Sequence, residues 1–216
     1  MMQILLDSAI LDEARQAAAW GWVSGATTNP TLLAQSDLPP AETLREMGKL
    51  LPGQVFYQLT GKDLQSMQTE AGRAFDILGG QLVLKIPATS LGFQAAARLS
   101  PKYPVAVTSI FTPAQAMLAA AAGARYALYY HNRAKRLLPD GQGEHLAEAL
   151  LRILAGTDTL VAAASLKTPE EMVEARTAGV PILSAPFAVL AQMPQHLLSE
   201  QAVAEFDAKG TGLLNG

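Results

Sequence analysis

The sequence predicts one (β/α)8 barrel domain over residues 1–216, with an extra helix at the C-terminus. Eight short apolar runs alternate with stretches that have helical features. The chain has 216 residues, half of them hydrophobic, which suits one barrel, and no domain linker is visible. An open doubly wound sheet is the alternative. It usually has fewer strands, and no Gly-x-Gly-x-x-Gly motif follows the first strand here.

The expected strands are short runs of aliphatic and small residues, which is typical of parallel strands covered on both faces. They span residues 4–6, 23–26, 55–59, 82–87, 105–108, 126–130, 159–164 and 180–183. The fourth strand should end near Pro87, because proline has no N–H group for the hydrogen-bond ladder.

The expected helices follow these strands, and capping residues mark several of their ends. Asp63 can cap a helix that Gly79 ends, Thr112 precedes a proline at the first helical position, and Thr168 has capping-box spacing to Glu171. A polar loop is expected at 131–133 and a turn-rich loop at 138–143. The expected helices with defined ranges span about 11–19, 63–78, 90–99, 112–123, 144–154 and 168–179. Two short helical segments follow the second strand, the second of them at about 40–51. Two more helices are expected, one after 184 and one from about 199.

The composition excludes several classes of function. The net charge of −3 gives no reason to expect nucleic acid or an anionic membrane as a partner, and the absence of cysteine excludes disulfides and thiolate metal sites. The start of the chain does not look like a signal peptide, and no apolar run reaches about 18 residues, so we expect a cytoplasmic protein. The three histidines are scattered, so no metal site is expected, and no cofactor motif is present.

Lys85 is the residue around which the functional hypothesis is built. It lies in the run Leu82–Pro87, near the carboxyl end of a strand that should be buried on both faces. Burial lowers the pKa of a lysine, and a neutral amine is the form that makes a Schiff base with a carbonyl group. The alternative is that Lys85 ends the strand and extends its ammonium group to water.

Polar residues at the other strand ends fit the same chemistry, because the catalytic groups of such barrels lie there. Asp7 can exchange protons, Gln58, Thr108 and Tyr130 can hold a water molecule, and Arg133 with Ser165 can bind phosphate. Five of these six residues have a purely structural alternative: Asp7 as a helix cap, Gln58, Thr108 and Tyr130 as satisfied polar core groups, and Arg133 as a solvated loop residue. The full set of strand-end candidates is Asp7, Thr27, Thr28, Asn29, Gln58, Lys85, Thr108, Tyr130, Asn132, Arg133, Ser165 and Lys167. Lys167 is the rival nucleophile, but its segment is less apolar.

Four motifs resemble the transaldolase family in order and spacing. They are Leu-Leu-Asp-Ser at 5–8, Gly-Ala-Thr-Thr-Asn-Pro at 25–30, Val-Leu-Lys-Ile-Pro at 83–87 and Ala-Ser-Leu-Lys-Thr-Pro at 164–169. The short chain is similar to the small-subunit branch, which includes fructose-6-phosphate aldolase and the short transaldolases.

The resemblance implies a class I mechanism without a cofactor. Lys85 matches the Schiff-base lysine and Asp7 the acid–base aspartate. Thr108 matches a threonine near the catalytic water. Thr27 and Asn29 match substrate-site residues, and Arg133 and Ser165 match the phosphate-binding pair.

Two positions distinguish the branches of the family. Transaldolases usually have Glu where this chain has Gln58 and Phe where it has Tyr130, whereas the aldolase branch has Gln and Tyr. With Gln58 and Tyr130, the sequence is more similar to fructose-6-phosphate aldolase. The chemistry agrees, because a tyrosine, a glutamine and a water molecule can protonate the enamine that is left on the lysine after cleavage and so free dihydroxyacetone. The chain departs from the family in the loop at 134–141 and at Tyr129, His131, Phe111 and Phe187.

The expected function is a class I aldolase that cleaves or forms a ketose phosphate such as fructose 6-phosphate. A short transaldolase that transfers a dihydroxyacetone unit is the alternative, and a non-catalytic sugar-phosphate-binding or scaffold protein is a third hypothesis. Expected partners are sugar phosphates or small ketones and aldehydes. The resemblance also implies a homo-oligomeric ring, such as a decamer of two pentamers that exchange C-terminal helices.

Overall fold

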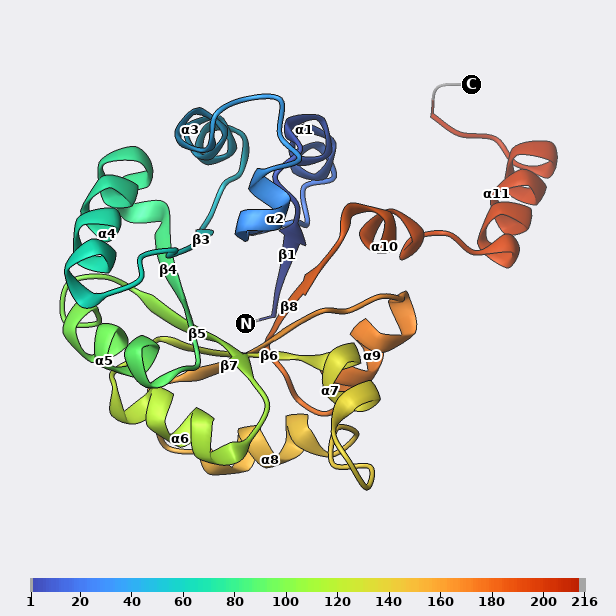
Figure 1. The fold of residues 1–216 in the computed structure, drawn as a ribbon. Helices are drawn as coiled ribbons and strands as arrows, with labels where there is room; N and C mark the ends of the chain where they lie inside the picture. The colour runs from blue at the N-terminus through green and yellow to red at the C-terminus, as the bar shows by residue number, and fades with distance from the viewer. Residues whose placement is uncertain (1, 214–216) are drawn as a thin grey trace.

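A closed barrel of eight parallel strands forms the centre of the computed structural model, which describes residues 2–213 (Figure 1). The strands follow one another around the barrel in chain order, and the eighth pairs with the first. Their bounds are β1 Gln3–Asp7, β2 Gly25–Thr27, β3 Val55–Gln58, β4 Leu82–Pro87, β5 Val105–Ile110, β6 Tyr126–Tyr130, β7 Leu160–Ala164 and β8 Ile182–Ala185. The predicted fold class is therefore confirmed.

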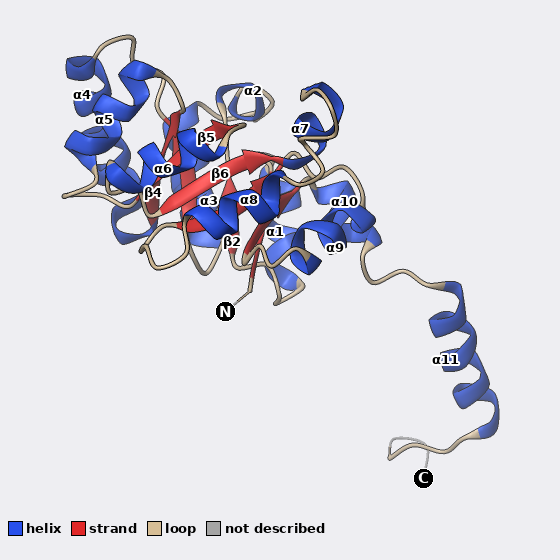
Figure 2. Ribbon diagram, turned by 90° about the horizontal axis from the view of Figure 1, so that it is seen from below, coloured by secondary structure: helices blue, strands red, loops and turns tan. Residues whose placement is uncertain are grey.

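Helices surround the strands, and one further helix extends away from the barrel (Figures 1 and 2). Their bounds are α1 Leu11–Ala19, α2 Pro30–Leu33, α3 Pro40–Leu50, α4 Leu64–Leu78, α5 Ser90–Leu99, α6 Pro113–Ala121, α7 His131–Leu137, α8 Leu146–Ile153, α9 Pro169–Thr177, α10 Phe187–Gln192 and α11 Leu197–Lys209, with a short 3₁₀ helix at Gly79–Gln81. Among residues 2–213, no helix is long and apolar enough to cross a membrane.

Two strands lie later in the chain than predicted. β2 begins at Gly25 and β8 at Ile182, whereas the expected strands began at Val23 and Val180. Both valines are buried, and the N–H group of Val180 donates to the carbonyl of Ala175 at the end of α9. An apolar residue can therefore fill the core without joining the sheet, which a pattern of hydrophobic residues does not reveal.

The predicted helix caps are present. The side chains of Asp63, Thr112 and Thr168 each accept a hydrogen bond from a backbone N–H group three residues later, which satisfies a donor in the first turn. The capping box expected at Thr168 differs in one detail. The carboxylate of Glu171 accepts the N–H group of Lys167, one residue before the expected donor.

The segment after β6 was predicted incorrectly. It forms the helix α7, where a polar loop was expected at 131–133, and α8 starts at Leu146 instead of 144. The N–H group of Asn132 donates to Ser165 O, and α7 packs against α9. These contacts stabilise a helix that its polar sequence did not predict. The last helix, α11, begins at Leu197, two residues earlier than expected.

The inside of the barrel has an apolar floor. Alternate residues of a strand point to the same face, so the strands fill the interior in layers. A separate core cluster contains Leu5, Phe56, Val83, Ala106, Tyr126, Leu128, Ala162, Ala164 and Ile182. Two residues after a member of this cluster come Asp7, Gln58, Lys85, Tyr130 and Ser184. The polar residues therefore form the last inward-facing layer, at the carboxyl ends of the strands.

Candidate active site

A cavity of about 560 Å³ opens at the carboxyl end of the barrel. Nine of the strand-end candidates have a predicted catalytic or substrate-binding role, and the cavity brings together seven of them: Asp7, Asn29, Gln58, Lys85, Tyr130, Arg133 and Ser165. The other two, Thr27 and Thr108, are buried and lie behind it, where they hydrogen-bond to Asp7 and Tyr130. The cavity wall also contains Lys167, the rival nucleophile.

Lys85 is almost completely buried, with 3% of its surface exposed, yet it lines the cavity. Its Nζ atom donates a hydrogen bond to the carbonyl oxygen of Thr28 at 2.7 Å. Burial lowers the pKa of Lys85 below the ordinary value, and Asp7 and Tyr130 partly oppose that shift. Lys167, in contrast, is exposed.

One hydroxyl group binds Asp7, and a second hydroxyl group contacts the first. The Thr27 hydroxyl donates to Asp7 Oδ1 at 2.7 Å, and the Ser184 hydroxyl lies 2.6 Å from that of Thr27. Asp7 and Thr27 are direct neighbours in the pairing of β1 with β2. The alternative role of Asp7 as a helix cap does not occur, because α1 has Ile10 at its N-cap and no side-chain cap bond.

Ser184 is a residue that the sequence prediction missed. The expected eighth strand ends at Leu183 and the next helix follows Ser184, so the sequence pattern leaves Ser184 between the two elements. In the structure β8 continues to Ala185, and the Ser184 side chain is buried inside the barrel. The signal was present as Ile182-x-Ser184, which places a hydroxyl two residues after an inward-facing isoleucine.

Tyr130 has contacts on several sides. Its hydroxyl accepts a hydrogen bond from Thr108 at 3.3 Å, Phe111 packs edge-on against its ring, and the guanidinium of Arg133 lies 4.7 Å from the ring centre. Thr108 reaches this position next to a β-bulge, where Ser109 has a φ of 61° and the pairing with β6 shifts register. Phe111 was identified as a departure from the family, and the structure places it against the tyrosine ring.

Asn29, Gln58 and Ser165 complete the polar lining. Asn29 caps α2 through Oδ1, which accepts the N–H group of Leu32 at 3.0 Å, and Gln58 pairs in register with Lys85 on the neighbouring strand. Ser165 has a φ of 58°. This conformation is strained for a residue with a side chain and is often found at functional sites.

A polar network fastens α7, which carries Arg133, to α9. Tyr129 and Glu174 flank the buried ring of His131, with contacts of 3.1 Å at Nδ1 and 3.2 Å at Nε2. Asn132 donates to Glu171 at 2.6 Å. Burial raises the pKa of the Tyr129 hydroxyl, which therefore stays protonated. Tyr129 and His131, two departures from the family pattern, thus serve to fix a helix.

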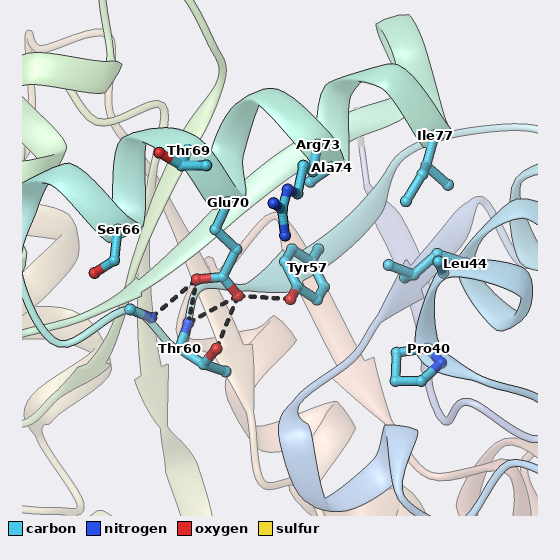
Figure 3. A pocket seen from close by; sticks show the side chains of 12 residues that line it. Pro40, Leu44, Tyr57, Thr60, Ser66, Thr69, Glu70, Arg73, Ala74 and Ile77 are labelled. Carbon is cyan, nitrogen blue, oxygen red and sulfur yellow. Dashed lines mark hydrogen bonds between the residues drawn. The ribbon is translucent and has the colours of Figure 1, made fainter.

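A second pocket of about 590 Å³ lies outside the barrel, between α3 and α4 (Figure 3). Glu70 dominates it. Its carboxylate accepts hydrogen bonds from the Tyr57 hydroxyl at 2.6 Å, from Thr60 and from Gly61. Burial alone would raise the pKa of Glu70, but these hydrogen bonds together hold it below the usual range. None of the predicted site residues lines this pocket, so the cavity at the strand ends is the candidate active site.

The described residues include no cluster of three or more His, Asp or Glu side chains that could hold a metal ion. The fold and the cavity define a class of protein: a (β/α)8 barrel with a buried lysine and an aspartate at the carboxyl ends of its strands.

The chain belongs to the transaldolase/fructose-6-phosphate aldolase family, whose model matches residues 4–213. A probable transaldolase of Kosmotoga olearia is 36% identical, with 98% of this chain and 100% of the relative covered. Probable transaldolases of Symbiobacterium thermophilum and Roseiflexus castenholzii are 35% and 37% identical, each with 95% of both chains covered. A crystal structure of mandelate oxidase has the same fold, with a TM-score of 0.61 at 14% identity over 94% of this chain and 71% of that chain.

Proposed function

We propose that this protein is a class I aldolase of the fructose-6-phosphate aldolase type. The observation that carries the proposal is the environment of Lys85, which combines burial, a lowered pKa and access to a cavity that also contains Asp7. A neutral lysine amine is the nucleophile that attacks a ketone, and a carboxylate within the same cavity can accept and return protons.

The reaction begins when Nζ of Lys85 attacks C2 of fructose 6-phosphate. Loss of water gives an iminium ion, which withdraws electrons from the neighbouring C3–C4 bond. Asp7 then accepts the proton of the C4 hydroxyl group, directly or through a water molecule, and the C3–C4 bond breaks. Glyceraldehyde 3-phosphate leaves, and the other three carbons remain on Lys85 as an enamine.

Protonation of the enamine at C3 and hydrolysis of the resulting iminium ion then release dihydroxyacetone. The Tyr130 hydroxyl is suited to this step, because Thr108 hydrogen-bonds to it and Phe111 and Arg133 contact its ring. Arg133 and Ser165 would bind the substrate phosphate, since both line the cavity and a guanidinium group can offer two parallel donors.

The experiment that tests the proposal is borohydride reduction in the presence of dihydroxyacetone. Peptide mass spectrometry should find the three-carbon adduct on the peptide that contains Lys85. An adduct on Lys167 with none on Lys85 would move the nucleophile to the seventh strand and refute the assignment. Lys85→Met is the matched variant and should give no adduct.

A short transaldolase is the second candidate, and a specific observation favours it: the curated relatives described above are named probable transaldolases. The presence of Tyr130 and Gln58 favours the aldolase. Incubation with fructose 6-phosphate alone separates the two. An aldolase releases free dihydroxyacetone, whereas a transaldolase releases none and transfers the unit only when erythrose 4-phosphate is added.

We also propose that the protein is a homo-oligomer, with a ring as the form that family resemblance implies. The helix α11 has no buried residue and extends away from the barrel (Figure 2). It exposes the apolar side chains of Leu197, Leu198, Val203 and Phe206. Light scattering should show an assembly that Phe206→Asp weakens. A monomeric wild-type protein would contradict this proposal.

A further inference from the structure

The Ser184 hydroxyl lies behind the acid–base aspartate without contacting the cavity. It is buried in β8, 2.6 Å from the Thr27 hydroxyl, which in turn donates to Asp7 Oδ1 at 2.7 Å. We propose that Ser184 is a positioning residue that fixes the Thr27 hydroxyl as a donor to Asp7 and thereby assigns the exchanged proton to Asp7 Oδ2. This inference rests on the proposed function of Asp7.

Counting protons gives the direction of the chain of hydrogen bonds. An ionised Asp7 can only accept, and the Thr27 hydroxyl has a single proton, which it donates to Oδ1. The contact between Thr27 and Ser184 must therefore use the proton of Ser184. The chain runs from Ser184 to Thr27 to Asp7, and each bond polarises the next, which strengthens the donation to the carboxylate.

The two oxygen atoms of Asp7 consequently have different roles. Oδ1 is occupied by Thr27, and the described residues supply no hydrogen-bond partner for Oδ2. None of the described side chains has a fully buried polar atom without a hydrogen-bond partner, so Oδ2, which has no partner, cannot be fully buried. Since Asp7 lines the cavity, Oδ2 is accessible from there. Oδ2 is the atom that can take the proton of a substrate hydroxyl or of a water molecule.

Ser184 also excludes an alternative orientation of the Thr27 hydroxyl group. If Ser184 were not donating to Thr27, the Thr27 hydroxyl could turn its proton away from Asp7, and Oδ1 would lose its partner. The proton taken up by Asp7 could then reside on either oxygen, including the one that faces away from the substrate. The other charged side chains that line the cavity with Asp7 are Lys85, Arg133 and Lys167, and among the described residues the Ser184 hydroxyl is hydrogen-bonded to Thr27 and to none of these three.

The test compares Ser184→Ala with Ser184→Cys. Cysteine fills the site with a sulfur atom that is larger than the serine oxygen, but its S–H group is a weak donor. Both variants therefore lose the strong hydrogen bond, while only alanine leaves a void. We expect kcat for fructose 6-phosphate cleavage to fall about tenfold in both, because general acid–base catalysis is impaired. The acidic limb of the kcat profile should move to higher pH, and the borohydride adduct on Lys85 should form to the wild-type extent.

Thr159→Val is the control, because it removes another buried hydroxyl group that is hydrogen-bonded at 2.7 Å, before β7 at the opposite end of the barrel. It should leave kcat and the pH profile unchanged. Wild-type kcat and pH profile in both Ser184 variants would overturn the inference, as would a loss in Ser184→Ala that Ser184→Cys restores, because packing would then explain the effect. Absence of the adduct in the wild-type enzyme would instead refute the proposed function itself.

Discussion

Replacing Lys85 by methionine keeps the side-chain volume inside the barrel but removes the amine, and it should change how the free energy of unfolding depends on pH. Burial lowers the pKa of Lys85 in the folded protein below 10.5, the ordinary value that it recovers on unfolding. Between these two pKa values the unfolded chain binds one proton more than the folded protein. The free energy of unfolding of the wild-type protein therefore rises with pH in this interval.

Proton linkage sets the upper limit of the slope. One proton of difference corresponds to a slope of about 1.4 kcal/mol per pH unit. The free energy of unfolding of Lys85→Met minus that of the wild type should therefore fall with pH by up to this slope, and become constant above pH 10.5. Methionine also leaves the Thr28 carbonyl without its donor, at a cost of about 1 kcal/mol, but this loss does not vary with pH.

Urea unfolding at a series of pH values from neutral to alkaline measures this difference directly. Lys62→Met is the matched control, because it makes the same replacement at an exposed lysine, and the slope for Lys85→Met is compared with it. A constant difference for Lys85→Met over the same range would refute the reasoning. It would mean that Lys85 binds its proton equally well in the folded and unfolded chains.

Three further predictions concern the loop after β3, the packing of α5 and the phosphate site. Glu70→Gln should lower the free energy of unfolding by about 1–2 kcal/mol, because the charge-assisted hydrogen bonds of the carboxylate are lost; urea unfolding measures it, and an unchanged midpoint would contradict it. Gly92→Ala should lower the free energy of unfolding by about 2–3 kcal/mol, since a Cβ atom would lie 1.9 Å from the carbonyl oxygen at the end of β4. Gly72→Ala in α4 is the control: its Cβ atom meets nothing within 4 Å, so the free energy of unfolding should stay the same or rise by up to about 1 kcal/mol. Equal melting temperatures for the two variants would be inconsistent with this packing. Arg133→Gln should raise KM for fructose 6-phosphate about tenfold, without changing KM for dihydroxyacetone in the synthetic direction. Arg136→Gln on the same helix is the control. A parallel rise of KM for both substrates in Arg133→Gln would exclude a phosphate-specific role.

The fold could be predicted because its signals are local. Alternating apolar runs and helices, with caps at residues such as Asp63 and Thr112, are each set by a few neighbouring side chains. In such barrels the catalytic groups lie at the carboxyl ends of the strands, so residues that are distant in the sequence are expected to meet there. Lys85 and Asp7 do line one cavity. Their catalytic roles remain predictions.

What escaped prediction depends on contacts between distant segments. The helix α7 is stabilised by a network that joins His131 to Glu174, 43 positions later in the chain, and no local pattern reveals such a partner. The position of Ser184 depends on where β8 pairs with β1, because a shift of one residue reverses which side chains point inward. The bulge at Ser109 likewise arises from pairing with β6.

The apolar floor beneath Lys85 determines how substrates and products reach and leave this residue. Large side chains such as Phe56 and Tyr126 pack against each other there and obstruct the lower end. Among the described residues, this packing leaves the cavity at the strand ends as the route by which molecules reach Lys85. Under the proposed reaction, glyceraldehyde 3-phosphate must leave through this opening while the three-carbon unit is still bound to Lys85. The aldehyde should therefore be released before dihydroxyacetone, and excess aldehyde should compete with the ketose for the enzyme.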